Sequence, residues 1–393
     1  MRIPGFTSTG SKRPEALFGA GAPRGLPVRL ARAAGAEVWD TEGREYLDFI
    51  MGLGAVALGY GHPAVNVAAH AAIDSGVIGP LPPELEERVA ERLAAMMPWM
   101  ERIRFLKTGA EAVAAAVRLA RAHTAREVVL RCGYHGWLDW SQPVGTPGVP
   151  AALFALSEEI PFNDVERGRS VIRLLGNRVA AVVIEPVVER APSGAWLTML
   201  REETRRAGSL LVLDEIKTGF RLAPGGAAER YNIDPDLVVL GKALANGFPL
   251  AAVGGRRDVM EQARTTWISS TLATETVSLA AAEATLRVVI EARLSEHLSQ
   301  VGRRWLDGLT ILGERFPELI GSVAGVPEMS FLRFHDEATG IRVARAAARA
   351  GLLFKRTAYN FVSLAHDVPA IDRGLGLLEE ACEAARRPST TGP

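Results

Sequence analysis

The amino-acid sequence predicts an α/β protein built on a mostly parallel β-sheet with helices on both faces. Two apolar runs, VAAVVI at Val179–Ile184 and SLLVL at Ser209–Leu213, lack the polar alternation of a half-exposed strand. Continuous apolar runs of this kind are typical of strands buried on both faces. Leu197–Ala207, which lies between them, has the spacing of a helix. Strands that alternate with helices indicate parallel pairing and helical cover.

The other elements follow in chain order. Residues 1–25 are rich in Gly, Pro, Ser and Thr and lack periodicity, so we expect an irregular N-terminal arm. Ala36–Ile50 alternates around an acidic-Gly turn, which predicts a β-hairpin. Apolar residues at helical spacing predict helices over 83–97 and Ala110–His123. Further strands are expected at Arg102–Leu106, Glu127–Arg131, Leu237–Leu240 and Ala251–Gly254, and a long helical tract at Thr276–Phe316.

The length indicates two domains, because the 393 residues exceed what one core usually organises. We expect residues 51–285 to form the large domain that contains the sheet. The arm and hairpin (residues 1–50) and the C-terminal part (residues 286–393) are expected to form a smaller α+β domain.

Composition and charge exclude several classes of protein. The 45 basic and 45 acidic residues cancel and form no block of one sign, which argues against nucleic-acid binding. The two cysteines cannot form a disulfide framework and suit a reducing cytoplasm. No signal peptide or long apolar run is evident, so we expect a cytoplasmic protein without a membrane span. The histidines show no metal-ligand spacing, and we expect no metal.

An apolar strand that ends in Asp214-Glu215 allows two chemical interpretations. A Walker B metal site would need a G-x-x-x-x-G-K-[ST] loop, which the sequence lacks. The second interpretation pairs Asp214 with Lys242, one of only five lysines, at the end of the next strand. Lysine as a Schiff base and aspartate on a pyridine nitrogen are what pyridoxal phosphate requires. Taken singly, Asp214 could be a helix cap and Lys242 a surface residue.

Two neighbouring segments add weaker signals. At Thr108, Gly109 and Ala110 a strand runs into a helix, whose first backbone N–H groups suit a phosphate, with the Thr108 hydroxyl as a further donor. An ordinary capped helix would have the same sequence. Gly133–Trp137, with Tyr134 and His135 between glycines after another strand, suggests a platform on which a ring stacks.

Together these segments resemble the class III aminotransferases, which are fold-type I enzymes dependent on pyridoxal phosphate. Within that family the sequence is most similar to the glutamate-1-semialdehyde aminomutase branch. The resemblance spans nearly the whole chain. The ordered motifs that carry it are Thr108–Ala112, Tyr134–Gly136, Glu185-Pro186, Asp214–Arg221 and Gly241-Lys242.

The resemblance implies a role for each matched residue. Lys242 would be the Schiff-base lysine and proton carrier, Asp214 would bond the pyridine nitrogen, and Tyr134 and Ile216 would cover the two ring faces. The implied cofactor contacts also include Thr108, Gly109 and Ala110 at the phosphate, His135, Glu185 near the ring hydroxyl, and Thr271 from the second subunit of a homodimer. Arg29 matches a position that can bind a substrate carboxylate, and Arg356 is a second candidate.

Three positions depart from the family pattern. Ala110 stands where a second hydroxyl is usual, and Glu189-Arg190 stands where the aminomutase branch has Gly-Asn. Ala358 falls where aminomutases carry a glutamate gate. Since an aminomutase must retain its intermediate, the missing gate favours transfer between two separate molecules.

We therefore expect an aminotransferase that moves an amino group from an amine or amino acid to a carbonyl compound. An intramolecular aminomutase or a racemase on the same cofactor is the alternative among enzymes. A non-catalytic partner protein built on this fold is disfavoured, because a scaffold has no use for the Lys242–Asp214 pair.

Overall fold

The structure, a computed structural model, describes residues 2–21 and 25–386 and divides the chain into two compact units. Unit 1 comprises Met1–His62 and Glu296–Pro393, and unit 2 is the continuous segment Pro63–Ser295. Both boundaries differ from the expected ones, because residues 51–62 belong to unit 1 and residues 286–295 to unit 2. Tyr60 explains the first difference: it forms a β-bridge with Gly35, and its hydroxyl donates to Asp48 at 2.7 Å.

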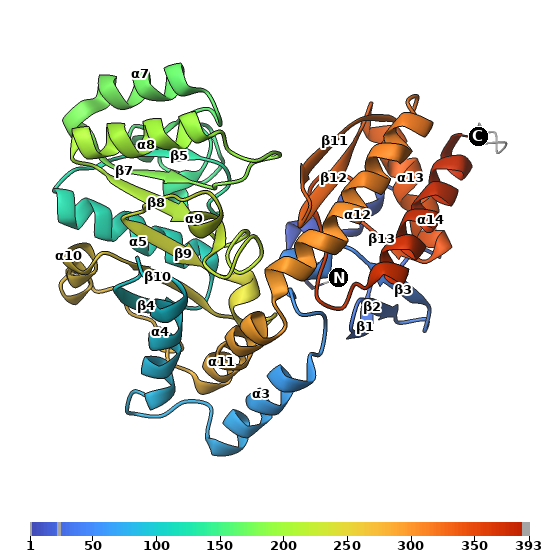
Figure 1. Cartoon of the computed structure of the whole chain (residues 1–393), viewed down its shortest axis with the longest axis horizontal. Coiled ribbons are helices and arrows are strands. Elements are labelled where there is room, and N and C mark those ends of the chain that lie inside the picture. Colours follow the sequence, from blue (N-terminus) through green and yellow to red (C-terminus); the bar gives the residue numbers. More distant parts are fainter. Residues whose placement is uncertain (1, 22–24, 387–393) are drawn as a thin grey trace. The chain divides into compact units, whose positions relative to one another are not determined.

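Unit 2 is built on a seven-stranded sheet in the order β4-β10-β9-β8-β7-β5-β6 (Figure 1). Only β10 runs antiparallel to its neighbours, and the other pairs within the sheet are parallel. The mostly parallel sheet predicted from the sequence is therefore confirmed. The strands are β4 (Arg102–Leu106), β5 (Val128–Cys132), β6 (Ser157–Glu159), β7 (Val179–Ile184), β8 (Leu210–Asp214), β9 (Leu237–Leu240) and β10 (Ala251–Gly255).

Helices cover both faces of this sheet (Figure 1). Alternate strand residues, among them Val183, Val212 and Val239, pack against Ala112 and Ala116 of α5 (Gly109–Thr124). The residues between them are also almost fully buried, on the opposite face. The other helices of unit 2 are α3 (Pro63–Ser75), α4 (Glu84–Met96), α6 (Ala151–Phe154), α7 (Val165–Leu175), α8 (Gly194–Ala207), α9 (Gly226–Arg230), α10 (Arg257–Met260) and α11 (Thr276–Glu291), with short 3-10 helices η2 (Asp139–Ser141), η3 (Gly176–Arg178), η4 (Lys242–Ala245) and η5 (Glu261–Arg264).

Unit 1 contains two small sheets. One has the order β1-β2-β3-β13 and contains the predicted hairpin, whose strands β2 and β3 pair antiparallel. The other has the order β11-β12-β14. The strands are β1 (Leu30–Ala34), β2 (Glu37–Asp40), β3 (Glu45–Asp48), β11 (Ile320–Val326), β12 (Met329–Phe334), β13 (Leu352–Leu353) and β14 (Asn360–Phe361).

The helices of unit 1 include two elements in the N-terminal arm, which was expected to be irregular. That expectation was wrong for η1 (Gly10–Lys12) and α1 (Pro14–Phe18), where Pro14 begins a short helix and Phe18 is buried. Residues 1 and 22–24, which we expected to belong to the arm, lie outside the described residues. The remaining helices are α2 (Met51–Gly54), α12 (Leu294–Arg315, whose first two residues lie in unit 2), α13 (Glu337–Ala350) and α14 (Val368–Arg386).

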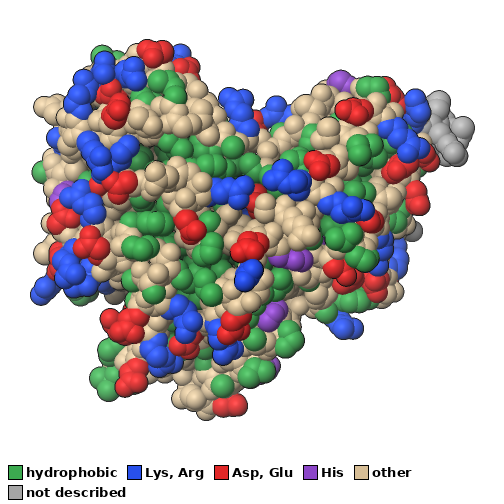
Figure 2. All heavy atoms as spheres, viewed as in Figure 1, with side chains coloured by type: hydrophobic (Ala, Val, Ile, Leu, Met, Phe, Trp, Pro, Cys, Tyr) green, Lys and Arg blue, Asp and Glu red, His purple; other side chains and the backbone are tan. Residues whose placement is uncertain are grey.

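The surface matches the balanced charge of the sequence. On the face drawn in Figure 2, acidic and basic side chains are interspersed. No helix in the described part of the chain is long and apolar enough to span a bilayer.

Candidate active site

Five loops that carry predicted site residues leave the same edge of the unit 2 sheet. They follow the carboxyl ends of β4, β5, β7, β8 and β9, strands that all run in one direction. In such sheets ligands bind beyond the carboxyl ends of the strands. The loops hold Thr108 to Ala110, Tyr134 and His135, Glu185, Asp214 and Ile216, and Lys242.

Asp214 and His135 form a buried pair at the centre of this edge. The His135 Nδ1 lies 2.8 Å from Asp214 Oδ2, and both side chains are at most 3% exposed. The other oxygen, Oδ1, accepts from the Ile216 N–H at 3.2 Å. A carboxylate has lone pairs for further donors. Asp214 is the last residue of β8, and the next α-helix begins only at Gly226, so Asp214 is not a helix cap.

Lys242 is the first residue of η4, two positions after β9 ends. It is partly buried, so the alternative of an ordinary surface lysine does not hold. Burial lowers the pKa of its amine to about 8, and the neighbouring Lys217 contributes in the same direction. Its φ of 42° lies in the left-handed region, which non-glycine residues adopt at a cost of about 1–3 kcal/mol. Backbone strain of this kind concentrates at functional sites.

Glu185 connects two loops of the edge. Its Oε1 pairs with Lys217 Nζ at 2.9 Å, and its Oε2 accepts from the Tyr134 N–H at 2.9 Å. Gly133 makes this approach possible, because a Cβ at that position would lie 2.6 Å from Glu185 Oε2. Sequence reasoning missed the role of Lys217, although it is one of five lysines and lies within the Asp214–Arg221 motif.

The start of α5 has the geometry of an anion site. Gly109 and Ala110 are its first two residues, and the first N–H groups of a helix have no acceptor within it. Gly109 must lack a side chain here, since a Cβ would lie 2.5 Å from the Ile216 side chain. Gly136 lies close to Ala110 in the same way, because a Cβ added at Gly136 would lie 2.6 Å from the Ala110 Cβ. The three loops therefore converge on this helix end.

Thr108 is the N-cap of α5, and its hydroxyl has a role within the helix. It accepts from the Glu111 N–H at 3.3 Å, while the Thr108 N–H donates to Glu111 Oε2 at 2.9 Å, which forms a capping box. The hydroxyl also donates to Glu111 Oε2 at 3.1 Å. The Thr108 hydroxyl, which we expected to donate to the phosphate, is thus already hydrogen-bonded to Glu111. The ordinary capped helix that the sequence left open describes Thr108 correctly.

The segment around Thr271 lies a few residues before α11. Ser269, Ser270 and Thr271 are exposed and do not cap α11. The N-cap is Glu275, which accepts from the Val277 N–H at 2.8 Å and pairs with Lys107 at 2.5 Å. The first N–H groups of α11 therefore already bind the protein's own carboxylate.

Arg29 and Arg356, the two candidate anchors for a substrate carboxylate, lie in unit 1. Arg29 is exposed and its guanidinium lies 4.4 Å from the centre of the Phe6 ring. It lines a cavity of about 560 Å³ together with Lys12, Trp39 and Asp48. Arg356 is buried and pairs with Glu337 at 3.2 Å. Their role toward a substrate stays a prediction.

The residues at this edge fit pyridoxal phosphate. In the described part of the chain, the buried His135 Nε2 has no hydrogen-bond partner, so the contact with Asp214 is the one hydrogen bond of the His135 ring. An aspartate fixed in this way, an amine of lowered pKa and a glycine-lined helix start match the pyridine nitrogen, aldehyde and phosphate of that cofactor. By contrast, the described residues contain no group of three or more His, Cys, Asp or Glu arranged to hold a metal ion.

The fold and this edge define a fold-type I enzyme of the pyridoxal-phosphate class. The model of the class III aminotransferases matches residues 20–370, so the chain belongs to the class III aminotransferase family. Its fold type, its enzymatic nature and its dependence on pyridoxal phosphate, all predicted from the sequence, are thereby confirmed.

Relatives and solved structures agree with this family. The glutamate-1-semialdehyde 2,1-aminomutase of Chloroflexus aggregans is 33% identical over 397 residues, covering 91% of each chain. The FumI protein of Sphingopyxis sp. MTA144 superposes with a TM-score of 0.88 at 27% identity, covering 94% of this chain and 91% of that one. An omega-transaminase from Sphaerobacter thermophilus gives a TM-score of 0.87 at 26% identity, with coverage of 98% and 95%.

Proposed function

We propose that Lys242 performs amino transfer between two separate molecules, an amine or amino acid donor and a carbonyl acceptor. The observation that carries this proposal is the position of Lys242, which follows β9, the strand adjacent to the one that ends in Asp214. Burial and the Lys217 ammonium lower the pKa of its amine to about 8. An amine with that pKa is partly uncharged at neutral pH and can act as a nucleophile and a base.

Each residue of the candidate site has a separate role in this proposal. Pyridoxal phosphate, when bound, supplies an electron sink for negative charge at the substrate carbon. Asp214, oriented by His135, would bind the pyridine nitrogen, and the first amides of α5 would hold the phosphate. Tyr134 and Ile216 would cover the ring, and Glu185 would serve its hydroxyl. The Lys242 Nζ takes the proton from the substrate carbon and returns it at the next step.

An aminomutase is the second candidate, because sequence relatives such as that of Chloroflexus aggregans carry this name. Ala358, in place of the glutamate gate, supports transfer between separate molecules instead. A racemase on the same cofactor is a third possibility on this site.

A half-reaction assay tests the proposal. We expect single amino donors to convert the cofactor stoichiometrically to its pyridoxamine form, with no further turnover until a carbonyl acceptor is added. Complete conversion of glutamate-1-semialdehyde without a second substrate would instead establish the aminomutase. Inversion of an amino acid with no loss of its amino group would establish the racemase.

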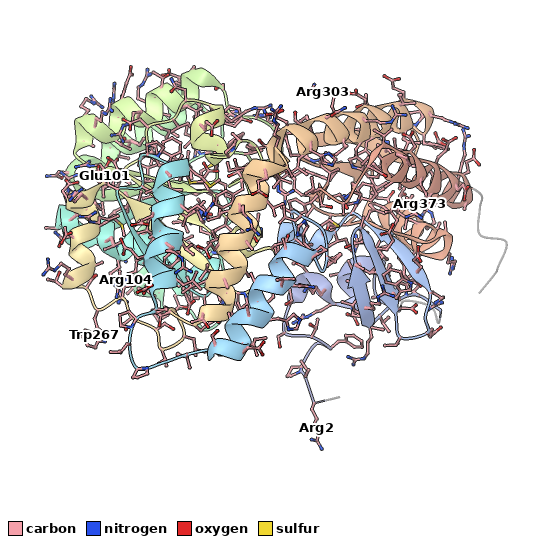
Figure 3. All side chains as sticks on the ribbon, turned by 60° about the horizontal axis from the view of Figure 1, so that its bottom comes forward. Arg2, Glu101, Arg104, Trp267, Arg303 and Arg373 are labelled. Atoms are coloured by element: carbon pink, nitrogen blue, oxygen red, sulfur yellow. The ribbon has the colours of Figure 1, made fainter. Side chains whose placement is uncertain are left out.

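We further propose that the active unit is a homodimer in which Thr271 of one subunit contacts the phosphate held by the other. A phosphate dianion has more acceptor sites than the Gly109 and Ala110 amides can fill. Residues 269–271 are exposed and do not cap α11, the helix that follows them. Unit 2 also exposes large apolar side chains, including Trp267 at 87% (Figure 3), Leu81 at 78% and Trp137 at 72%. Such surfaces are commonly covered by a partner.

Subunit mixing tests the shared site. Lys242→Ala and Thr271→Asp should each be inactive, yet a mixture after subunit exchange should recover about one quarter of wild-type activity. In a mixed dimer one site combines both changes and the other has neither. Half of the dimers are mixed, and each has one working site.

A matched mixture provides the control. Lys242→Ala with Asp214→Asn places both changes in residues of one chain's own site, so every site in the mixed dimer keeps a lesion. This mixture should stay inactive. If the Thr271 mixture is equally inactive although exchange is demonstrated, Thr271 does not act across the interface.

We also place the enzyme in the cytoplasm, which the two buried, unpaired cysteines, Cys132 and Cys382, support. Fractionation of cells that express the native chain checks this location, and recovery from a secreted fraction would contradict it.

A further inference from the structure

Three of the five lysines of the chain follow strands at this edge of the sheet, and two of them, Lys217 and Lys242, follow adjacent strands. Lys217 follows Asp214 of β8 by three residues, and Lys242 follows β9 by two. The two strands are parallel neighbours, with Asp214 opposite Val239. The Lys217 side chain is only 8% exposed. A second buried ammonium next to the proposed reactive lysine requires a physical reason, because burying a charge is unfavourable unless it is paired.

Glu185 holds the Lys217 ammonium in place. Its Oε1 lies 2.9 Å from Lys217 Nζ, and its Oε2 is fixed by the Tyr134 N–H at 2.9 Å. The absent side chain of Gly133 leaves room for this carboxylate. These contacts therefore hold the Lys217 ammonium in place among the loops that follow β5, β7 and β8.

Several charged groups act on the Lys242 amine from these loops. Burial and the Lys217 ammonium lower its pKa most, and Arg221 lowers it further. Glu185 and Asp214 act in the opposite direction, toward the charged amine. His135 faces the site through its contact with Asp214. The Lys217 and Arg221 cations therefore act together with burial in favouring the uncharged amine, against Glu185 and Asp214.

We propose that Lys217 is a positioning residue whose ammonium, held by Glu185, increases the uncharged, reactive fraction of the Lys242 amine. This inference rests on the proposed function of Lys242. A like charge nearby disfavours a second charge, typically by a factor of ten or more in the protonation equilibrium. Lys217 acts through the electric field at Lys242 and needs no contact with the substrate.

The charge state of Lys242 can be measured without the cofactor. The apoenzyme is labelled briefly with acetic anhydride across a range of pH, and peptide mapping gives the rate at Lys242. Only the uncharged amine reacts, so the rate reports the neutral fraction. Lys12, which is exposed, serves as the reference in each sample.

Substitution of Lys217 should shift this profile in a defined direction. In Lys217→Met the labelling midpoint of Lys242 should rise from about 8 by about one pH unit, which makes labelling at pH 7 about tenfold slower. Lys217→Arg, which keeps a cation, should retain the wild-type midpoint. A Lys217→Met midpoint equal to that of the wild type would overturn the proposal and leave Lys217 a purely structural partner of Glu185.

Removing Lys217 also frees Glu185, which would itself favour the charged amine. A double-mutant cycle separates the two effects. Glu185→Gln alone should lower the midpoint, because Lys217 then repels Lys242 without compensation. Adding Lys217→Met to Glu185→Gln should raise it again. If the midpoints of these two variants coincide, the shift in Lys217→Met belongs to Glu185 and the proposal is wrong.

The labelling assay can contradict the proposed effect of Lys217 without contradicting the proposed role of Lys242, and the converse also holds. A shifted midpoint with no covalent attachment of cofactor to Lys242 would support the effect of Lys217 and reject the role of Lys242. Covalent attachment of the cofactor to Lys242, with an unchanged midpoint in Lys217→Met, would support the role of Lys242 and reject the effect of Lys217.

Discussion

Replacing Lys242 with alanine should abolish amino transfer, with turnover reduced by about 10⁴-fold or more. The change removes both the nucleophile that holds the cofactor and the group that carries the proton, and each of these contributions is large. The other two lysines of unit 2 are each bound to a carboxylate, Lys217 to Glu185 and Lys107 to Glu275, so neither amine is placed to replace that of Lys242. Turnover is measured with the donor that the half-reaction assay identifies.

Borohydride reduction of the wild-type holoenzyme, followed by peptide mapping, locates the attachment directly. The label should lie on Lys242 and disappear in Lys242→Ala. Lys355→Met is the matched control, since Lys355 is also a half-buried lysine whose pKa burial lowers. It should keep the label and the activity. Label on any other lysine would show that Lys242 is misassigned.

Changing Asp214 to asparagine should preserve the fold and reduce turnover about 100- to 1000-fold, equivalent to about 3–4 kcal/mol of lost stabilisation. The amide oxygen can still accept from the Ile216 N–H, so the loop keeps its conformation. A neutral amide, however, cannot keep a pyridine nitrogen protonated. The loss should appear in kcat, because charge develops at the substrate carbon only during the reaction.

The control for Asp214→Asn is Asp307→Asn, an exposed aspartate on α12. It should leave kcat and the melting temperature unchanged. Near-wild-type kcat in Asp214→Asn would place the pyridine nitrogen elsewhere. A large fall in its melting temperature would instead attribute the lost activity to unfolding.

The sheet was predictable where strands are buried on both faces. Val179–Ile184 and Leu237–Leu240 agree with β7 and β9 residue for residue, because apolar runs of this length suit only a covered sheet. The short edge strand β6 (Ser157–Glu159) was missed, since it is polar and only partly buried. The helix α3 was missed because most of its apolar residues are alanines, which give little contrast between faces.

The candidate site was predictable at the level of residues and less so at the level of partners. The strand pattern placed Asp214 and Lys242 at one edge because parallel strands share their carboxyl ends. The contact between His135 and Asp214 joins residues 79 positions apart, and no local pattern encodes it. The same holds for Lys217 with Glu185 and for Lys107 with Glu275. The use of Thr108 was misjudged because Glu111, three residues later, completes its capping box.

The division of unit 1 between the two ends of the chain imposes an order on its biosynthesis. Unit 2 is continuous, so a ribosome releases all of its strands before the C-terminal part of unit 1 exists. Until then β3 lacks its parallel partner β13, and Phe49 lacks Trp305, on which its ring stacks at 3.9 Å. Domains generally fold as units during synthesis. The N-terminal segment therefore lacks this apolar cover until the C-terminal part of unit 1 has been synthesised.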